Sequence, residues 1–292
     1  MVDGSPRLAG GAESALDRAT IERRLDAFVA ENRFTISVVV PLMGAATLIA
    51  GAMELLPAWL AFNPYFILSG TLIMRLPLIA GVAPLVGRKA AALLAGTCLY
   101  AYAIEIVGIR TGWPYGPFEY TIELGPMIEG VPLGLPLFFL PLVLNAYLLA
   151  VLLLGGLAAR RAVRLPATLA VVLAIDLVLD PGAVAVGFWE YLDGGVYYGV
   201  PLTNYAGWVL SGTVATVAFD LAFDRTDLIA RLDERGFMLD DLVSFVVLWG
   251  LVNLAFANWV PVIVALGLAG GLIATDRFDF DVTSVPGASL RR

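Results

Sequence analysis

The chain has 292 residues, of which 60% are hydrophobic and 15% are charged, whereas a soluble globular domain is nearer half apolar and a quarter charged. Its net charge of −7 argues against nucleic acid as a partner. The single cysteine, Cys98, excludes an internal disulfide, and the lack of histidine leaves acid–base chemistry to carboxyl and tyrosine side chains.

Residues 1–35 form a polar N-terminal segment, which we expect to be cytoplasmic. It lacks the short apolar stretch and the small-residue cleavage site of a signal peptide. Residues 36–275 contain several apolar runs longer than the roughly 18 residues needed to cross a membrane. Since the alternating pattern of a barrel is absent, we predict an all-α, polytopic transmembrane helix bundle, followed by a polar C-terminal tail at 276–292.

Eight spans fit the hydropathy pattern, or seven if the last two form a re-entrant hairpin. Almost no loop separates these two, because only the short sequence around Asn258 lies between them. The predicted spans cover residues 36–56, 62–82, 90–109, 133–158, 165–188, 205–223, 242–257 and 259–275.

Basic residues gather in alternate loops. Sixteen of the eighteen lie before the first span, after the last one, or in the loops at 88–89, 160–164 and 225–235. The intervening loops hold only Arg110, and Arg75 lies within a span. The positive-inside rule therefore places both termini in the cytoplasm, with the loops at 110–132 and 189–204 outside the cell membrane.

The charge composition also bears on habitat. The chain has 25 acidic residues against 18 basic ones, and Lys89 is its only lysine. An acidic, lysine-poor surface is typical of proteins from halophilic organisms, in which net charge maintains solubility. The alternative is an arginine-rich composition imposed by a genome of high GC content.

Two of the predicted outer loops share a sequence pattern. Each begins with a glycine and an aromatic cluster, at 112–120 and at 187–191, and ends in Gly-Val-Pro-Leu before the next span. Each also follows an intramembrane acid, Glu105 or Asp180, by seven residues. We interpret this as a degenerate internal repeat of spans 3–4 and 5–6, an arrangement that often frames a central site. Independent use of aromatic residues in the interfacial belt is the alternative.

Ionisable residues within a bilayer are costly, so each is a candidate functional residue. We expect four acids, together with Arg75, to converge on one cavity below the aromatic loops. Asp220 lies near the inner end of its span, and we assign it to a cytoplasmic charge cluster with Asp224 and Arg225. The four converging acids are Glu54, Glu105, Asp176 and Asp180.

Asp176 and Asp180 are four residues apart and so lie on one helix face. Two carboxyl groups that close together in a low dielectric cannot both ionise cheaply, so one is expected to stay protonated. Such a group could donate a proton to a weak base, for example an alkene. Pairing with Arg75, or capping of a helix broken at Pro181, is the structural alternative.

The aromatic residues of the loops also allow two interpretations. Tryptophan and tyrosine at span ends are usually belt residues. Their density beside acids suits a carbocation, which aromatic faces stabilise, or a flat conjugated substrate. The candidate substrate-binding aromatics are Trp113, Tyr115, Trp189, Tyr197, Tyr198 and Trp208.

These motifs resemble the integral-membrane carotenoid hydratases of the CruF type over about residues 36–275. The second motif runs from Asp180-Pro181 through 187–189 and 197–201 to Asn204-Tyr205 and Gly207-Trp208, and the first runs from Glu105 through 112–116 and Tyr120 to 130–133. The resemblance implies addition of water to terminal isoprenoid double bonds. The substrate in halophilic archaea is the C50 carotenoid bisanhydrobacterioruberin, which becomes bacterioruberin, and the acidic composition favours that version.

We assign roles to the candidate residues from their chemistry. Asp180, or alternatively Glu105, donates a proton to the alkene, and Asp176 orients the attacking water. Asn204 hydrogen-bonds this water or the product, and Arg75 completes the substrate site. No cofactor or metal is expected, because hydration is redox-neutral. The carotenoid lies in the bilayer, and other membrane enzymes of carotenoid biosynthesis are the expected partners.

Two other functions compete with hydration. Asp176-x-x-x-Asp180 and Asp220-x-x-x-Asp224 each resemble half of a magnesium–diphosphate site, as in membrane prenyltransferases that act on isoprenoid lipids. That function requires both pairs on one membrane face, whereas the predicted topology separates them. A transporter or proton channel requires polar residues along the whole path, yet most candidates lie in the outer half.

Overall fold

The computed structural model describes residues 10–275 together with Phe278 and Val282, with side chains described from Asp17 onward. The remainder of the predicted polar ends, 1–9 and most of 276–292, lies outside the described residues. The described helices are α1 (Gly10–Glu31), α2 (Val40–Ala52), α3 (Pro64–Val82), α4 (Arg88–Thr111), α5 (Leu135–Leu154), α6 (Arg161–Val186), α7 (Leu202–Ala222), α8 (Arg225–Glu234), α9 (Asp240–Ala255) and α10 (Trp259–Ile273).

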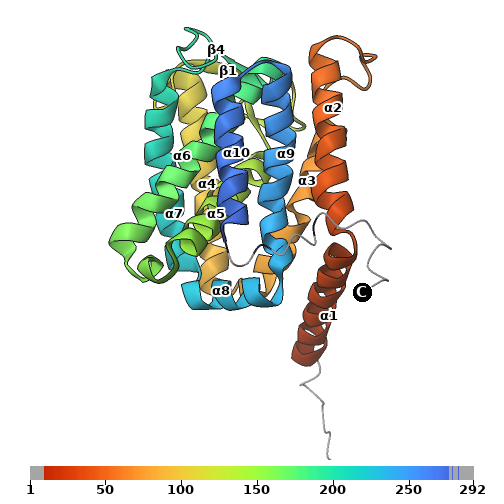
Figure 1. Ribbon diagram of the computed structural model, residues 1–292, viewed down its shortest axis with the longest axis vertical. Helices are drawn as coiled ribbons and strands as arrows, with labels where there is room; N and C mark the ends of the chain where they lie inside the picture. Colours follow the sequence, from red (N-terminus) through yellow and green to blue (C-terminus); the bar gives the residue numbers. More distant parts are fainter. Residues whose placement is uncertain (1–9, 276–277, 279–281, 283–292) are drawn as a thin grey trace, which may run out of the picture.

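The long helices run roughly side by side and form an all-α bundle, which confirms the predicted fold class (Figure 1). α8 lies across one end of this bundle, α1 projects beyond the same end, and the short strands lie at the opposite end (Figure 1). α5 is the central helix, since every residue from Pro141 to Val151 is buried. The outer surfaces of α2, α3 and α4 carry exposed apolar side chains, as expected for helices that face lipid.

Each predicted span overlaps a helix of the structure. In the described part of the chain, six helical segments are long and apolar enough to cross a membrane, and α7 qualifies when taken with α8, from which it bends by 80°. α10 has 15 residues, so it is about 22 Å long against a hydrocarbon core of about 30 Å. The protein is therefore a multi-pass membrane protein, and the count of eight full spans stays a prediction.

The predicted polar N-terminal segment folds as helix α1, which continues through the π-helical turn η1 (Thr35–Val39) into α2. The Asp26 carboxylate accepts hydrogen bonds from Arg231 (2.8 Å) and Arg235 (2.9 Å), at the C-terminal end of α8. Arg18 donates to the carbonyl oxygens of Ala83 and Val86. These contacts hold α1 and α8 at the same end of the bundle.

A buried carboxylate with two arginine partners also lies at this end. Asp220 is held by Arg164 (Nη2–Oδ1, 2.5 Å) and Arg161 (Nε–Oδ2, 3.0 Å), and the Tyr147 hydroxyl donates to it at 2.9 Å. We expected Asp220 to join a charge cluster with Arg225, but the arginines that pair with it come from α6. The predicted interpretation of Asp220 as a structural residue agrees with these contacts.

Two short antiparallel pairs close the opposite end. Strand β1 (Phe118–Tyr120) pairs with β4 (Trp189–Tyr191), which joins the two aromatic loops. β2 (Met127–Ile128) and β3 (Val131–Pro132) form a hairpin within the first loop. Because side chains alternate along a strand, the aromatic residues of β1 and β4 point into the bundle while Glu119 and Glu190 face outward.

Candidate active site

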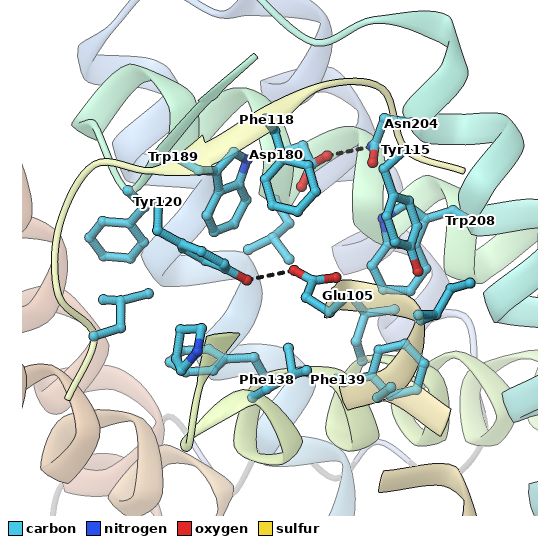
Figure 2. A pocket seen from close by; sticks show the side chains of 18 of the residues that line it. Glu105, Tyr115, Phe118, Tyr120, Phe138, Phe139, Asp180, Trp189, Asn204 and Trp208 are labelled. Atoms are coloured by element: carbon cyan, nitrogen blue, oxygen red, sulfur yellow. Dashed lines mark hydrogen bonds between the residues drawn. The ribbon is translucent and has the colours of Figure 1, made fainter. Parts of the chain in front are cut away.

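A cavity of about 110 Å³ lies beneath the β1–β4 pair (Figure 2). α4, α5, α6, α7 and α9 contribute its walls, and the two strands contribute its roof. Most lining side chains are aromatic or aliphatic, and the acids among them are Glu105 and Asp180. The structure therefore places the two acids of the predicted repeat in one cavity.

Glu105 projects from α4 and is held by a tyrosine of the adjoining loop. The Tyr120 hydroxyl donates to Glu105 Oε1 at 2.6 Å (Figure 2). Burial and the neighbouring carboxylate raise the pKa of the Tyr120 phenol well above its usual range. Tyr120 therefore stays a hydrogen-bond donor, and Oε2 of Glu105 is left for other partners.

Asp180 projects from α6 and is held in a similar way. Its Oδ2 accepts hydrogen bonds from the Tyr191 hydroxyl (3.1 Å) and from Asn204 Nδ2 (2.5 Å). Burial, followed by the charges of Asp180 and Asp176, raises the pKa of the Tyr191 phenol, which therefore stays protonated. Since Oδ2 is occupied by two donors, a proton on Asp180 is favoured on Oδ1.

Asp176 lies one helical turn before Asp180 and is completely buried. Asn204 Nδ2 also donates to Asp176 Oδ2 at 3.2 Å, so one amide group bridges the two carboxyl groups. Asp176 does not line the cavity itself. The predicted pair is thus adjacent in the structure, with Asp180 facing the cavity and Asp176 behind it.

The two loops match in backbone conformation as well as in sequence. Gly112 and Gly187 end α4 and α6 in the left-handed conformation, with φ of 74° and 76°. Glu129 and Gly130 have φ of 51° and 84°. Tyr198 and Gly199, at the corresponding positions of the second loop, have φ of 50° and 85°. Both turns precede Val-Pro, which supports the predicted repeat, although the relation of whole spans stays a prediction.

Three of the six predicted aromatics line the cavity. Tyr115, Trp189 and Trp208 face it, and the Trp208 ring stacks on Phe139 at a centroid distance of 5.6 Å. Gly207 brings α7 close to Tyr115, since a Cβ at this position would lie 2.4 Å from Tyr115 Cδ1. The Tyr115 hydroxyl is hydrogen-bonded to Ser211 Oγ at 2.6 Å, which fixes the ring against the wall.

The other three aromatics lie elsewhere. Trp113 is 57% exposed and does not line the cavity, which fits the belt interpretation. The hydroxyl of Tyr198 accepts a hydrogen bond from the backbone of Val260 at 3.2 Å. Tyr197 donates to the carbonyl oxygen of Leu177 at 3.2 Å. Nothing in these contacts brings the three rings to the acids that line the cavity.

The Tyr197 hydrogen bond satisfies a carbonyl group that Pro181 leaves without a partner in α6. Pro181 has no N–H, so the carbonyl of Leu177, four residues earlier in α6, lacks its helical partner. Asn253 of α9 donates to the next carbonyl, that of Val178, at 2.8 Å, and Asn258 donates to Pro181 at 3.3 Å. These three side chains satisfy backbone carbonyls around Pro181, within the continuous helix α6, as a lipid-embedded helix requires.

Arg75, which lies in α3, likewise satisfies a backbone carbonyl that a proline leaves free, in this case in α5. Its Nη1 pairs with Asp241 at 2.7 Å, and its Nε donates at 3.2 Å to Leu137, the carbonyl left free by Pro141. Asn145 also donates to Asp241. Arg75 does not line the cavity, and the structure does not bring it to the acids with which we expected it to converge. Glu54 is likewise apart, exposed in the loop after α2.

Sequence reasoning assigned no role to several residues of the site. Tyr120 and Tyr191 hold the two acids, and their signal was the matching Phe-Glu-Tyr and Trp-Glu-Tyr of the loops. Phe139 and Trp249 line the cavity without a distinguishing motif. Within the described residues, no group of three or more acidic or cysteine side chains could hold a metal ion.

The fold and site define a multi-pass membrane protein with an acid-containing, aromatic cavity near one end of its helix bundle. A family model described as carotenoid biosynthesis protein matches residues 62–272, and the chain belongs to this family. The chain is also 58% identical over 284 residues to a protein named bisanhydrobacterioruberin hydratase from Haloarcula japonica, with 97% of each chain covered. No solved structure matches the chain significantly.

Proposed function

We propose that this protein is a carotenoid hydratase, which adds water to a terminal double bond of bisanhydrobacterioruberin and so forms bacterioruberin. The observation that carries the proposal is the 58% identity with a hydratase of that name over 97% of both chains. The chemistry of the cavity is consistent with it, because the cavity joins two carboxyl groups to aromatic walls.

Asp180 is the proposed proton donor. Tyr191 and Asn204 occupy its Oδ2, so the proton on Oδ1 is the one available to an alkene. Transfer to the less substituted alkene carbon leaves a tertiary carbocation. The faces of Trp189, Tyr115 and Trp208 stabilise this cation without offering it a nucleophile. Attack by water then gives a tertiary alcohol.

Glu105 is the second carboxyl group of the cavity and the alternative donor. Tyr120 holds Glu105 Oε1 much as Tyr191 holds Asp180 Oδ2. Asn204 bridges Asp180 to a further carboxyl group, whereas Glu105 has no such neighbour among the hydrogen bonds of the described residues. This arrangement favours Asp180 as the group that exchanges protons during the reaction.

The size of the cavity bears on how a long substrate binds. About 110 Å³ is well below the roughly 300–1,000 Å³ of a pocket that encloses a drug-sized ligand. It accommodates a small apolar end group rather than a polyene. We therefore propose that the carotenoid enters end-on, with its conjugated chain outside the cavity along the helices or in lipid.

The competing functions have less support. A prenyltransferase needs both aspartate pairs around one diphosphate, but Arg164 and Arg161 hold Asp220 near the other end of α6. Arg164 and Asp180 are separated by about 24 Å of helix. A transporter needs a path to both faces, and the acid cavity is bounded on its inner side by apolar residues such as Leu142 and Leu179.

A direct assay tests the proposed function. Purified protein in lipid, given bisanhydrobacterioruberin and no nucleotide, flavin or metal, should yield products heavier by one water for each hydrated end. The visible spectrum should not change, because the polyene is untouched. Mass spectrometry with oxygen-labelled water should find the label in the new hydroxyl. Activity lost with a chelator and restored by Mg²⁺ would support the prenyltransferase instead.

The orientation in the membrane is a second proposal, based on the basic loops: both termini and α8 in the cytoplasm, with the acid cavity near the outer face. In a Cys98→Ser background, Asp193→Cys should react with an impermeant thiol reagent in intact cells. Asp227→Cys, exposed on α8, should react only after permeabilisation. The opposite pattern would contradict this orientation.

A further inference from the structure

Two buried polar atoms near Asp180 have no partner in the described protein. Asp176 Oδ1 and the Tyr205 hydroxyl make no hydrogen bond to any described residue. Asp176 is completely buried, and a carboxyl oxygen left unpaired in an apolar interior is expensive. Buried polar groups of this kind are normally satisfied by protein or by ordered water.

The two residues lie on sides of α6 and α7 that face each other, because these helices pack together. Gly212, seven residues after Tyr205 and so on the same face of α7, packs against Leu169 and Val172 of α6. Asp176 follows Val172 by one turn on that face of α6. The ring of Tyr205 also packs on Tyr197 at a centroid distance of 5.8 Å, and Tyr197 binds the carbonyl of Leu177, beside Asp176.

We infer that Asp176 Oδ1 and the Tyr205 hydroxyl, which both lie outside the cavity lining, bind one water behind Asp180, and that this water adds to the carbocation once the end group of the substrate lies against Asp180. The inference rests on the proposed hydratase function. Asn204 donates to Oδ2 of both aspartates, so it keeps Asp176 Oδ1 free to accept from the water. The Tyr205 hydroxyl donates to the water oxygen and fixes its lone pairs.

Protons and bonds balance in this scheme. Asp180 gives its proton to one alkene carbon, and the water oxygen forms a bond to the other. The water then loses a proton to Asp176, and return of that proton to Asp180 restores both groups. The net reaction is alkene plus water to alcohol, and Tyr205 is a residue that contacts the reacting water.

A reaction run in deuterium oxide distinguishes two steps, which are the delivery of a proton to the alkene and the capture of the resulting cation by water. If the cation forms but no water is placed to attack, it loses a proton from a neighbouring carbon to the carboxylate. The recovered alkene then carries deuterium. Tyr205→Phe should lower hydration about tenfold to a hundredfold, as expected for loss of one hydrogen bond in this setting. Deuterium incorporation into recovered substrate should persist. Asp176→Asn should behave in the same way.

Thr216→Val is the matched control. It removes another buried, unpartnered hydroxyl from α7, about 16 Å along the helix from Tyr205, and should leave both rates unchanged. Unchanged hydration in Tyr205→Phe, or equal loss of hydration and deuterium incorporation, would overturn the water site. Wild-type protein that catalyses neither reaction would instead refute the proposed function.

Discussion

Asp180→Asn should reduce the rate of hydration by about 10²–10⁴-fold, the usual cost of losing a general acid. The amide keeps the shape of the carboxyl group and its place beside Tyr191 and Asn204, but it has no acidic proton. The protein should still insert and bind carotenoid. Conversion of bisanhydrobacterioruberin by purified protein in lipid measures the effect, and deuterium incorporation should fall in parallel.

Two further variants serve as comparisons for Asp180→Asn. Glu105→Gln tests the alternative donor, and a loss as large as that of Asp180→Asn would mean that both carboxyl groups are needed. Asp220→Asn removes a buried carboxylate outside the cavity, where it holds Arg164. It should lower stability while preserving the rate per folded molecule. If the Asp180→Asn protein forms the normal product at the normal rate, Asp180 is not the proton donor and the proposed mechanism is wrong.

The second large effect is expected on stability. Asp241 is completely buried and pairs with Arg75, which is itself 7% exposed. Asp241→Leu leaves a buried guanidinium without its anion, and breaking such a pair typically costs about 3–5 kcal/mol. The free energy of unfolding should fall by this amount, and the apparent melting temperature in detergent should fall with it.

The double variant Arg75→Met with Asp241→Leu is the control for that prediction. Replacing both partners by apolar residues of similar volume is often neutral or stabilising, so most of the lost stability should return. Its rate per folded molecule then tests the predicted substrate role of Arg75. A double variant as unstable as Asp241→Leu alone would mean that packing, rather than charge, holds this site.

The positions of the helices could be predicted because a lipid-embedded helix must be apolar over most of its length. The residues at which the helices begin could not be predicted in the same way. The predicted seventh span begins at residue 242, directly after Asp240 and Asp241. The helix includes both, since Arg33 pairs with Asp240 at 2.7 Å and Arg75 neutralises Asp241. Partners so distant in the chain leave no local signal.

The acids of the site could be predicted for a similar reason, since an unpaired charge in a span is expensive. Glu105 and Asp180 do meet in one cavity, as their matched spacing indicated. The donors that hold them come from β1 and β4, whose pairing joins residues about 70 apart in the chain. Tyr197 looked like a substrate-binding aromatic, but its hydroxyl satisfies a carbonyl freed by Pro181.

The β1–β4 pair places Glu119 directly opposite Glu190, with both side chains exposed on the outer face. Like charges at directly opposed positions weaken a strand pair. Dissolved salt relieves this repulsion, because screening shortens the range of charge interactions from about 10 Å at 0.1 M to about 3 Å at 1 M. We therefore expect the two strands that form the roof of the cavity to be held together more firmly in concentrated brine than in dilute buffer, so that ionic strength acts directly on the element that covers the two acids.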